Sequence, residues 1–450
     1  MKLEVSVKNL GQIKEANFHI RPITVITGPN GTGKSFFTKS LYSILNVVNR
    51  NVYHENIIDT IQDIRFQFDV LVDNADANVA IANKIKSELL QLQTEFEKAS
   101  RWKINDYFSF AVSKTKSVDA IDESYRSTFL LEPKEGISLG ISARIKDLLI
   151  TLVNCRTVYI DFLNVHVKDE LLESFQVAAL SELTRFGEKQ IEVRIDDFFA
   201  MEISEERLLI DIGTSLIDDF VMLSSVVFFE SPAYWKVRDA LKSAKNNPNR
   251  PPLMGRKNDD ILTGVPKYFY DLDIALNTRT KTEGTFKSAT DLLTHTLGGE
   301  FIFKGDELSF KDKNGREISK NLMSFGMTNL GMIQALLKYN IITAGSFIFI
   351  DEPETNLHPD WQVKLVDVLL LLAQGGVNIV ITTHSSDLVK ALEVKIKKLE
   401  IDVMEDFLSV HFLGTDGKLL EFESKDSLQQ IIEARELLSL AYQQLYFSDL

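Results

Sequence analysis

Residues 346–359 read SFIFIDEPETNLHP, an apolar run that ends in adjacent carboxylates. The run from Phe347 to Ile350 is too short for most helices, so it predicts a strand buried on both faces of a parallel sheet. In an open α/β sheet of this kind, ligands bind beyond the carboxyl ends of the strands. Asp351 and Glu352 follow the run directly, and we expect them to project into that crevice. A solvated strand end is the alternative interpretation of this stretch taken alone.

A second motif, GPNGTGKS at residues 28–35, matches the phosphate-binding pattern G-x-x-x-x-G-K-[ST] in full. A short apolar run precedes it and a helix-like segment follows it, which is the strand–loop–helix context that the motif requires. The backbone N–H groups of such a loop wrap phosphates, and the helix N-terminus adds a favourable dipole. The predicted nucleotide-binding residues are Gly28, Pro29, Asn30, Gly31, Thr32, Gly33, Lys34, Ser35 and Phe36.

The two motifs together predict a magnesium–nucleotide site. Two carboxylates at one strand end are costly without a nearby cation, which a metal–nucleotide complex supplies. We expect Lys34 to reach the β- and γ-phosphates, and Ser35 and Asp351 to hold Mg²⁺. Glu352 is then placed to orient or deprotonate a water molecule.

Two further candidates carry weaker signals. Ser324 and Gly326 can present a hydroxyl group and backbone N–H groups at the start of a helix expected from about Thr328. An ordinary capped helix is the alternative. His384 follows the next buried run, so it should lie beside Asp351, where it can contact a γ-phosphate. A structural histidine is the alternative there.

Composition limits the class of protein. The 450 residues, 44% of them hydrophobic and 25% charged, suit a globular chain of two or three domains. The single cysteine, Cys155, excludes an intramolecular disulfide and a multi-cysteine zinc site. We expect a cytoplasmic protein without a membrane segment, because no apolar run approaches the ~18 residues that a span needs. The net charge of −14 argues against nucleic-acid binding by the whole surface and leaves room for a local basic patch.

The spacing of the motifs predicts two domains. We expect an α/β head with a mixed sheet, formed by residues 1–46 and 222–450, and an insertion over residues 47–221. The insertion should be mainly helical, and apolar positions from 141 to 162 alternate by four and three as in one helix of a bundle. Residues 191–212 alternate like strands and predict a hairpin.

Three more segments have local signatures. Val226–Phe229 predicts another buried strand. Residues 245–265 are rich in Pro, Asn and Gly and predict an exposed loop whose basic side chains could touch nucleic acid, although a solvated loop is the alternative. The tail predicts a hairpin from residue 409, followed by a helix capped by Asp426.

The order of these elements resembles the ATP-binding-cassette (ABC) ATPases of the SMC, RecF and OLD type, and their stand-alone bacterial relatives, the AAA-family ATPases of antiphage systems. The resemblance rests on VKNLGQIKEANF before the phosphate loop, MSFGM as a degenerate signature, FIDEPETNLHP and ITTHSS. It implies ATP and Mg²⁺ as cofactors, with Lys34, Glu352 and His384 as catalytic residues. It also implies a head-to-tail homodimer or higher homo-oligomer, in which Ser324 and Gly326 contact the ATP of the opposite protomer.

The chain departs from the family pattern at three points. MSFGM lacks the second signature glycine, which suggests slow or partner-gated hydrolysis. VKNLGQ has no arginine after its asparagine, so that family contact is not carried over. The Q-loop glutamine has no clear counterpart, and Gln62 and Gln67 are the candidates.

The resemblance implies the ATPase subunit of a two-component defence complex, as in Septu-type or PARIS-type pairs. Such a subunit controls a separate nuclease and responds to nucleic acid or a phage protein. OLD nucleases continue into a TOPRIM domain, for which too few residues follow His384 here. Two other functions stay open: a RecF- or SMC-like repair ATPase that clamps DNA, and a nucleotide-dependent scaffold with slow turnover.

Overall fold

A computed structural model describes most of the chain as two compact units. Residues 1–46, 168–209 and 223–450 form the first unit, and residues 47–167 and 210–222 form the second. The described residues are 1–73, 79–129, 135–213, 218, 221, 223–230, 233–245, 264–277, 284–304 and 307–448.

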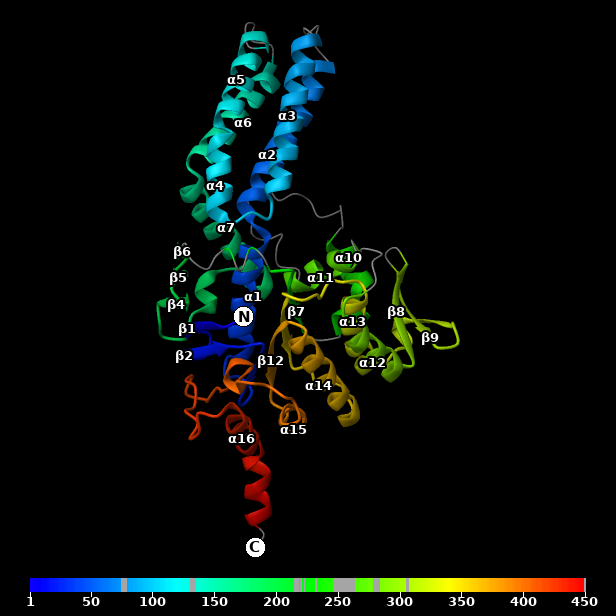
Figure 1. The fold of residues 1–450 in the computed structure, drawn as a ribbon. Coiled ribbons are helices and arrows are strands. Elements are labelled where there is room, and N and C mark those ends of the chain that lie inside the picture. Colours follow the sequence, from blue (N-terminus) through cyan, green and yellow to red (C-terminus); the bar gives the residue numbers. More distant parts are fainter. Residues whose placement is uncertain are drawn as a thin grey trace. The chain divides into compact units, whose positions relative to one another are not determined.

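The core of the first unit is a five-stranded sheet in the order β13-β3-β12-β11-β7, in which all neighbours are parallel. Two of its strands, β7 and β12, are labelled in Figure 1. Its strands are almost wholly buried, as expected for a parallel sheet covered on both faces. The phosphate loop and the carboxylates therefore emerge at the same edge. The strands are β3 (Ile23–Thr27), β7 (Val226–Phe229), β11 (Phe347–Asp351), β12 (Asn378–Thr383) and β13 (Leu408–Phe412).

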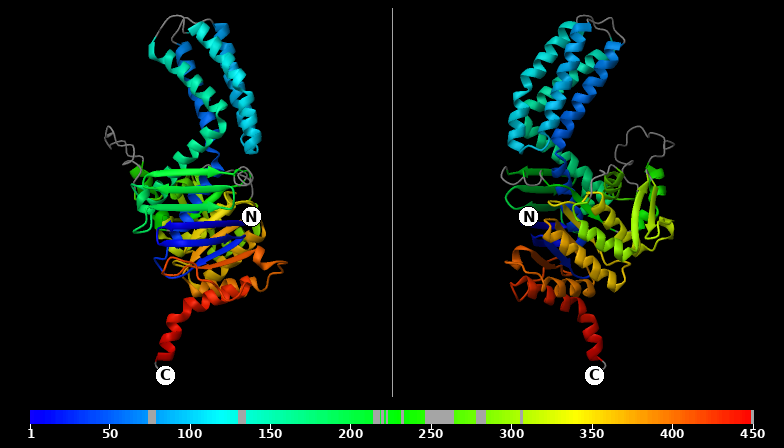
Figure 2. Two further views of the ribbon diagram at one scale, coloured as in Figure 1. Left: turned by 90° about the vertical axis from the view of Figure 1, so that its left-hand side faces the viewer. Right: turned by 45° about the vertical axis from the view of Figure 1, so that its right-hand side comes forward.

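A second five-stranded sheet has the order β2-β1-β4-β5-β6, and its strands run side by side in the left view of Figure 2. Buried and exposed residues alternate along it, because one face packs on the core. A third, three-stranded sheet has the order β10-β9-β8. These strands are β1 (Leu3–Leu10), β2 (Ile13–Ile20), β4 (Gln190–Ile195), β5 (Phe199–Ser204), β6 (Arg207–Ile212), β8 (Gly299–Lys304), β9 (Glu307–Asp312) and β10 (Glu317–Ser319).

The helices of the first unit begin with α1, which starts at the phosphate loop. In the later part of the chain, α12 packs against α13 and α14, and α15 packs against α14 and α16. These helices are α1 (Lys34–Arg50), α9 (Ala233–Lys236), α10 (Arg238–Lys245), α11 (Lys267–Asn277), α12 (Lys287–Leu297), α13 (Phe325–Lys338), α14 (Pro359–Gln374), α15 (Ser386–Ile396) and α16 (Ser427–Ser448), with 3₁₀ turns at Leu180–Leu183, Lys320–Leu322 and Met404–Asp406.

The second unit is a helical bundle, in which α2 packs against α3 and α6, and α5 packs against the same two helices (Figure 1). Among the described residues no single helix is long and apolar enough to cross a membrane, although one bent pair, 138–153 with 155–175, passes on length and composition alone. The helices are α2 (Val52–Asp73), α3 (Val79–Ala99), α4 (Ile104–Ser113), α5 (Thr115–Phe129), α6 (Glu135–Val153) and α7 (Cys155–Phe175).

The predicted α/β class is confirmed, with differences in its details. The phosphate-loop sheet is purely parallel rather than mixed, and the antiparallel strands lie in separate sheets. The expected insertion over 47–221 is interrupted, because residues 168–209 pack with the first unit. The reason is that β4 pairs with β1, with Val193 opposite Val7. The expected hairpin over 191–212 is a run of three strands.

The single helix expected over 141–162 is wrong. The chain breaks at Asn154, and the helices on either side meet at 104°. The apolar period continues across the break, because Leu152, Cys155 and Tyr159 are all buried. Periodicity therefore identified a buried stripe on each helix and missed the bend between them.

Other local predictions have mixed outcomes. The strand at Val226–Phe229 is confirmed, and the Asp426 carboxylate caps α16 by accepting a 2.7 Å hydrogen bond from the Leu428 N–H. The tail hairpin is reduced to one bridge between Leu413 and Leu419. Of the expected loop at 245–265, only residues 245, 264 and 265 are described, so its basic patch lies outside the described residues.

Candidate functional site

The phosphate loop has the backbone that its glycines allow. Gly28, Gly31 and Gly33 have φ angles of +133°, +77° and +106°, a region that L-residues with side chains rarely adopt. At Gly28 a Cβ would also lie 2.2 Å from the carbonyl oxygen of Leu413. Helix α1 starts at Lys34, so the N–H groups of its first turn have no partner within the helix and can bind an anion.

Lys34 folds back onto its own loop. Its Nζ donates hydrogen bonds to the carbonyl oxygens of Gly28 (2.9 Å) and Pro29 (2.8 Å). Burial lowers the pKa of Lys34, and the carboxylates of Glu352 and Asp351 oppose that shift. The ammonium group is thus held in a polar loop near two carboxylates, where phosphate oxygens can replace the carbonyl acceptors.

Asp351 connects the two sequence motifs. Its Oδ1 accepts a hydrogen bond of 3.1 Å from the Ser35 hydroxyl and another from the Thr382 hydroxyl. Burial raises the pKa of Asp351, and these two hydroxyl groups partly oppose the shift. Sequence reasoning missed Thr382, although it is the next-to-last residue of β12, the strand that leads to His384.

The donor set fits a magnesium ion bound to a triphosphate. Ser35 and Asp351 supply the hard oxygen atoms that Mg²⁺ prefers. Within the described ranges no group of three or more His, Cys, Asp or Glu side chains is arranged around a metal position. Such an ion would therefore complete its shell with phosphate and water oxygens, as magnesium commonly does.

Glu352 and His384 form a pair beside this position. Oε1 of Glu352 lies 3.2 Å from Nδ1 of His384, and both side chains are about two-fifths exposed. Glu352 has a φ of +49°, which is costly for a residue with a side chain. Its N–H donates to the carbonyl oxygen of Thr382 at 3.0 Å, which holds this turn against β12. The exposed carboxylate can therefore accept a proton from a water molecule.

Glu354 is a buried partner that sequence reasoning missed. Its Oε1 accepts hydrogen bonds from the Thr383 hydroxyl (2.6 Å) and the His384 N–H (3.3 Å). Burial raises the pKa of Glu354, and among the described residues its Oε2 has no hydrogen-bond partner. The carboxylate thus fixes the backbone that carries His384. In the sequence, only its position two residues after Glu352 pointed to Glu354.

Glu230 is a further carboxylate at the same sheet edge. Phe229 on β7 pairs with Ile350 on β11, so Glu230 follows its strand level with Asp351. It pairs with Lys39 at 3.0 Å and accepts a hydrogen bond from the Tyr268 hydroxyl. The strand at 226–229 was predicted, and the strand-end rule applied there would have found Glu230.

The two Q-loop candidates are placed elsewhere. Gln62 and Gln67 lie inside helix α2 of the second unit, not in a loop after a core strand. Gln67 donates to Asp63 on its own helix at 3.0 Å. Neither glutamine therefore lies at the end of a strand of the core sheet.

A buried polar cluster lies further along α1 within the first unit. The Asn46 side chain donates to Glu170 at 3.1 Å, and Glu170 pairs with Lys267 at 2.9 Å. Lys267 also pairs with Asp271 at 2.7 Å. Burial raises the pKa of Glu170, and the Lys267 ammonium opposes the shift. The cluster ties the helix of the phosphate loop to α11 and to the end of α7 from residue 168, which belongs to the first unit.

Ser324 and Gly326 lie at the start of α13. The helix begins at Phe325, three residues before the expected start, with Ser324 as its N-cap. The Ser324 Oγ accepts a hydrogen bond from the Met327 N–H at 3.2 Å. A Cβ on Gly326 would lie 2.6 Å from the carbonyl oxygen of Asn356, so glycine allows a close approach to the loop after Glu352. Neither residue hydrogen-bonds the phosphate loop among the described residues of this single chain.

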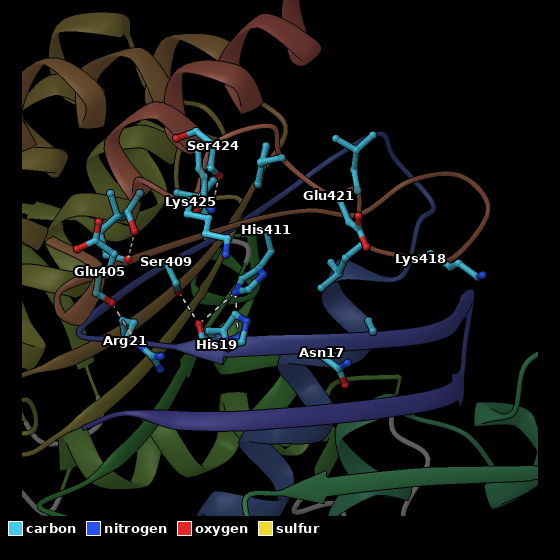
Figure 3. Close-up of a pocket in the computed structure, with 18 of the residues that line it drawn as sticks. Asn17, His19, Arg21, Glu405, Ser409, His411, Lys418, Glu421, Ser424 and Lys425 are labelled. Atoms are coloured by element: carbon cyan, nitrogen blue, oxygen red, sulfur yellow. Dashed lines mark hydrogen bonds between the residues drawn. The ribbon is translucent and has the colours of Figure 1, made fainter.

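A cavity of about 690 Å³ lies apart from these residues (Figure 3). Its lining includes His19 and Asn17 from β2, and Ser409 and His411 from β13. The His19 N–H donates to Nε2 of His411 at 3.1 Å, and burial lowers the pKa of His411 to about 4. None of the predicted site residues lines this cavity.

Comparison with known proteins assigns the family. A family model described as an AAA ATPase domain matches residues 1–389, most of the chain. The chain belongs to the AAA ATPase domain family. This ATPase is also 26% identical over 207 residues to the Old nuclease of Escherichia phage P2, a match that spans 45% of the chain. It covers only 33% of the length of that nuclease. The two matches confirm the predicted resemblance to ATPases of the SMC, RecF and OLD class.

The solved structures that the comparison found to be similar include heads of SMC proteins. The SMC head domain from Thermotoga maritima has 12% identity and a TM-score of 0.32, over 92% of this chain and 94% of that one. An SMC head bound to the C-terminal winged-helix domain of ScpA has 12% identity and a TM-score of 0.42, over 95% and 98%. An ATP-binding cassette of an ABC transporter in its ADP conformation has 12% identity and a TM-score of 0.31, over 96% and 98%.

Proposed function

We propose that this ATPase binds ATP with Mg²⁺ and hydrolyses it at the edge of the parallel sheet. The observation that carries the proposal is the hydrogen bond from Ser35 to Asp351, which joins the phosphate loop to the carboxylate strand. In this arrangement the N–H groups of the phosphate loop and Lys34 bind the phosphates. Ser35 and Asp351 hold the metal ion, which neutralises phosphate charge when bound.

The remaining residues act on the attacking water. The Glu352 carboxylate orients the water and accepts its proton, as a positioned general base does. His384 lies beside this carboxylate and contacts the terminal phosphate. Glu354 keeps the His384 backbone in place through its hydrogen bond with the N–H.

We further assign the first unit as the ATPase head and the second as its insertion. Two heads associate head to tail, so that Ser324 and Gly326 reach the ATP held by a second copy. The exposed N-cap of α13 supports this role, because the free N–H groups of a helix start bind anions.

The biological role that we propose is control of a separate nuclease in a cytoplasmic antiphage complex. The similarity to a phage P2 protein named a nuclease supports a link to nucleic-acid cleavage. Cleavage is assigned to a partner chain, and nucleic acid or a phage protein triggers the complex.

Phosphate release tests the enzymatic part. The wild-type protein should hydrolyse ATP with Mg²⁺ and stop when EDTA removes the metal. Glu352→Gln should lower kcat by about 10²- to 10⁴-fold and leave ATP binding intact, because it removes only the general base. Glu421→Gln, an exposed glutamate in the tail, is the control and should match the wild type. Equal kcat for Glu352→Gln and wild type would refute the assignment.

Copurification tests the biological part. A nuclease encoded beside this gene should be retained by the tagged ATPase, and the complex should cleave nucleic acid when triggered. Cleavage by the purified ATPase alone would overturn the division of labour. Hydrolysis stimulated by duplex DNA, with a steep salt dependence, would favour the DNA-clamping alternative instead.

A further inference from the structure

Lys236, the last residue of the short helix α9, contacts the segment on both sides of Ser324. Its Nζ donates a hydrogen bond to the carbonyl oxygen of Lys320 at 2.9 Å and another to that of Met323. The same ammonium group lies 5.6 Å from the centre of the Phe325 ring. One side chain thus contacts the residue before Ser324 and the residue after it.

The segment that carries Lys236 is itself anchored. Arg238 is fully buried and pairs with Asp273 on α11. Asp239 adds a second tie to the same loop, because its Oδ2 lies 2.7 Å from Nζ of the buried Lys320. Lys236 therefore extends from a fixed base and does not merely follow the loop that it contacts.

The opposite side of the loop is anchored to the loop that follows β11. Gly326 packs against the carbonyl oxygen of Asn356, as described above. The buried side chain of Asn329 donates to the carbonyl oxygens of Pro353 (3.3 Å) and Thr355 (3.5 Å). Ser324 is exposed between these two anchors, one from the segment after β7 and one from the loop after Glu352.

Lys236 makes hydrogen bonds and an aromatic contact, not an ion pair. In the described part of the chain, Lys236 forms no ion pair with a carboxylate, and its partners are two carbonyl groups and an aromatic ring. Burial lowers the pKa of Lys236, so holding it at this place has a cost. Carbonyl groups bonded by a charged donor keep a defined direction, which fixes the peptide that leads into Ser324.

We propose that Lys236 is a positioning residue that fixes the Met323–Phe325 segment for contact with the triphosphate held by a second copy of the chain. The inference rests on the proposed function, in which Ser324 acts across the interface between two heads. Lys236 matters especially here because Phe325, the residue after Ser324, has an exposed ring that lies under the Lys236 ammonium group. A bulky ring beside Ser324 needs support if the Ser324 hydroxyl is to stay accessible to a phosphate.

ATP-dependent association of Glu352→Gln protein tests the proposal, because this parent holds ATP without turnover. Adding Lys236→Ala should raise the dimer dissociation constant measured by analytical ultracentrifugation about 10- to 100-fold, the loss expected for hydrogen bonds from a charged group. ATP affinity at protein concentrations that keep the chain monomeric should stay within about twofold. Lys236→Arg should restore association, because a guanidinium can donate to two carbonyl groups and stack on a ring.

Lys338→Ala is the matched control. Lys338 lies in the last turn of α13, the helix that starts at Phe325. Its Nζ lies 5.5 Å from the centre of the Tyr339 ring and pairs with Glu300. This variant should associate like the parent. In proteins that keep Glu352, Lys236→Ala should lower kcat with little change in KM, since it leaves the phosphate loop intact.

The outcomes separate the inference from the function on which it rests. Parent-like association of Lys236→Ala would overturn the inference and leave the head-to-tail assembly standing. Failure of the Glu352→Gln parent to associate with ATP would overturn both. Loss of ATP affinity together with a lower midpoint of thermal unfolding in Lys236→Ala would mean a general structural role and would also overturn it.

Discussion

The hydroxyl group of Ser35 donates a 3.1 Å hydrogen bond to Oδ1 of Asp351, a residue 316 positions later in the chain. The same oxygen accepts from Thr382, so two hydroxyl groups surround the carboxylate. Hydroxyl donors hold the carboxylate in one direction but supply only part of the compensation that a cation would give. The Asp351 carboxylate is therefore held in position, and a bound cation would stabilise its negative charge further.

Nucleotide binding should weaken in mild acid because of Asp351. Burial raises the pKa of Asp351, so the carboxylate takes up a proton at a higher pH than an ordinary aspartate. The metal binds the ionised form, and affinity for Mg–ATP should fall as the pH drops through that raised pKa. Titrations with Mg–ATP at several pH values between 8 and 5 would measure this loss of affinity. Asp351→Asn should bind Mg–ATP weakly and without this pH dependence. A pH profile of Asp351→Asn that matches the wild type would contradict the assignment.

Glu354→Ala should reduce both stability and turnover. The substitution leaves the Thr383 hydroxyl and the His384 N–H without their acceptor, which costs about 1–3 kcal/mol of unfolding free energy. It should also lower kcat, because His384 loses its backbone support. Urea unfolding and phosphate release measure the two effects. Glu354→Gln keeps an acceptor oxygen and should recover most of the stability, and a Gln variant as unstable as the Ala variant would argue against this role.

Gly326→Ala should destabilise the first unit by about 1–3 kcal/mol. The added Cβ would lie 2.6 Å from the carbonyl oxygen of Asn356, so the loop after Glu352 must move. ATP-dependent association should weaken in the same variant. Gly140→Ala in helix α6 is the control, since its Cβ meets only Gln67 at 3.6 Å. The control should be neutral or up to about 1 kcal/mol more stable, as alanine is in a helix. Equal effects of both substitutions on urea unfolding would remove the packing argument.

Lys267→Ala should cost about 3 kcal/mol or more at neutral pH, because it leaves the buried carboxylate of Glu170 without its cation. Burial holds the pKa of Glu170 above the 4.5 of an unfolded chain. A raised acid pKa means that the folded state binds the proton more tightly than the unfolded state. The associated stability is complete below pH 4.5 and is lost as the pH rises through the folded pKa.

The deficit of Lys267→Ala should therefore shrink as the pH is lowered toward 4.5. Urea unfolding at several pH values measures it. Lys364→Ala, an exposed lysine on α14, should stay within about 0.5 kcal/mol of the wild type. A deficit for Lys267→Ala that does not change with pH would mean that Glu170 is not the group responsible.

Local sequence patterns identified the phosphate loop and the first two carboxylates, and they missed Thr382 and Glu354, which hold Asp351 and the His384 backbone in place. The loop at residues 28–35 and the pair Asp351–Glu352 were recognisable because spacing and residue type define their chemistry. Thr382 and Glu354 act only once β11 lies beside β12, a pairing that no local pattern encodes. Glu230 is different, because it directly follows the predicted strand at Val226–Phe229 and its place at a strand end can be read from the sequence.

The domain boundary depended on the same kind of long-range pairing. The alternation at residues 191–212 predicted strands correctly, but it could not name β1 as their neighbour. The strands were therefore assigned to the insertion. At Asn154 the local pattern was misleading in another way. The apolar period continues across this residue, although the helix axis changes direction there.

The position of β3 has a consequence for how the protein matures. This strand, which delivers the phosphate loop, is flanked only by β12 and β13, both from the last part of the chain. A ribosome therefore releases the phosphate loop long before it makes either flanking strand. A polypeptide that stops before β12 and β13 holds the loop without the two strands that flank β3, so we expect it to bind nucleotide poorly. Nucleotide binding should therefore begin only after both of these strands have been made.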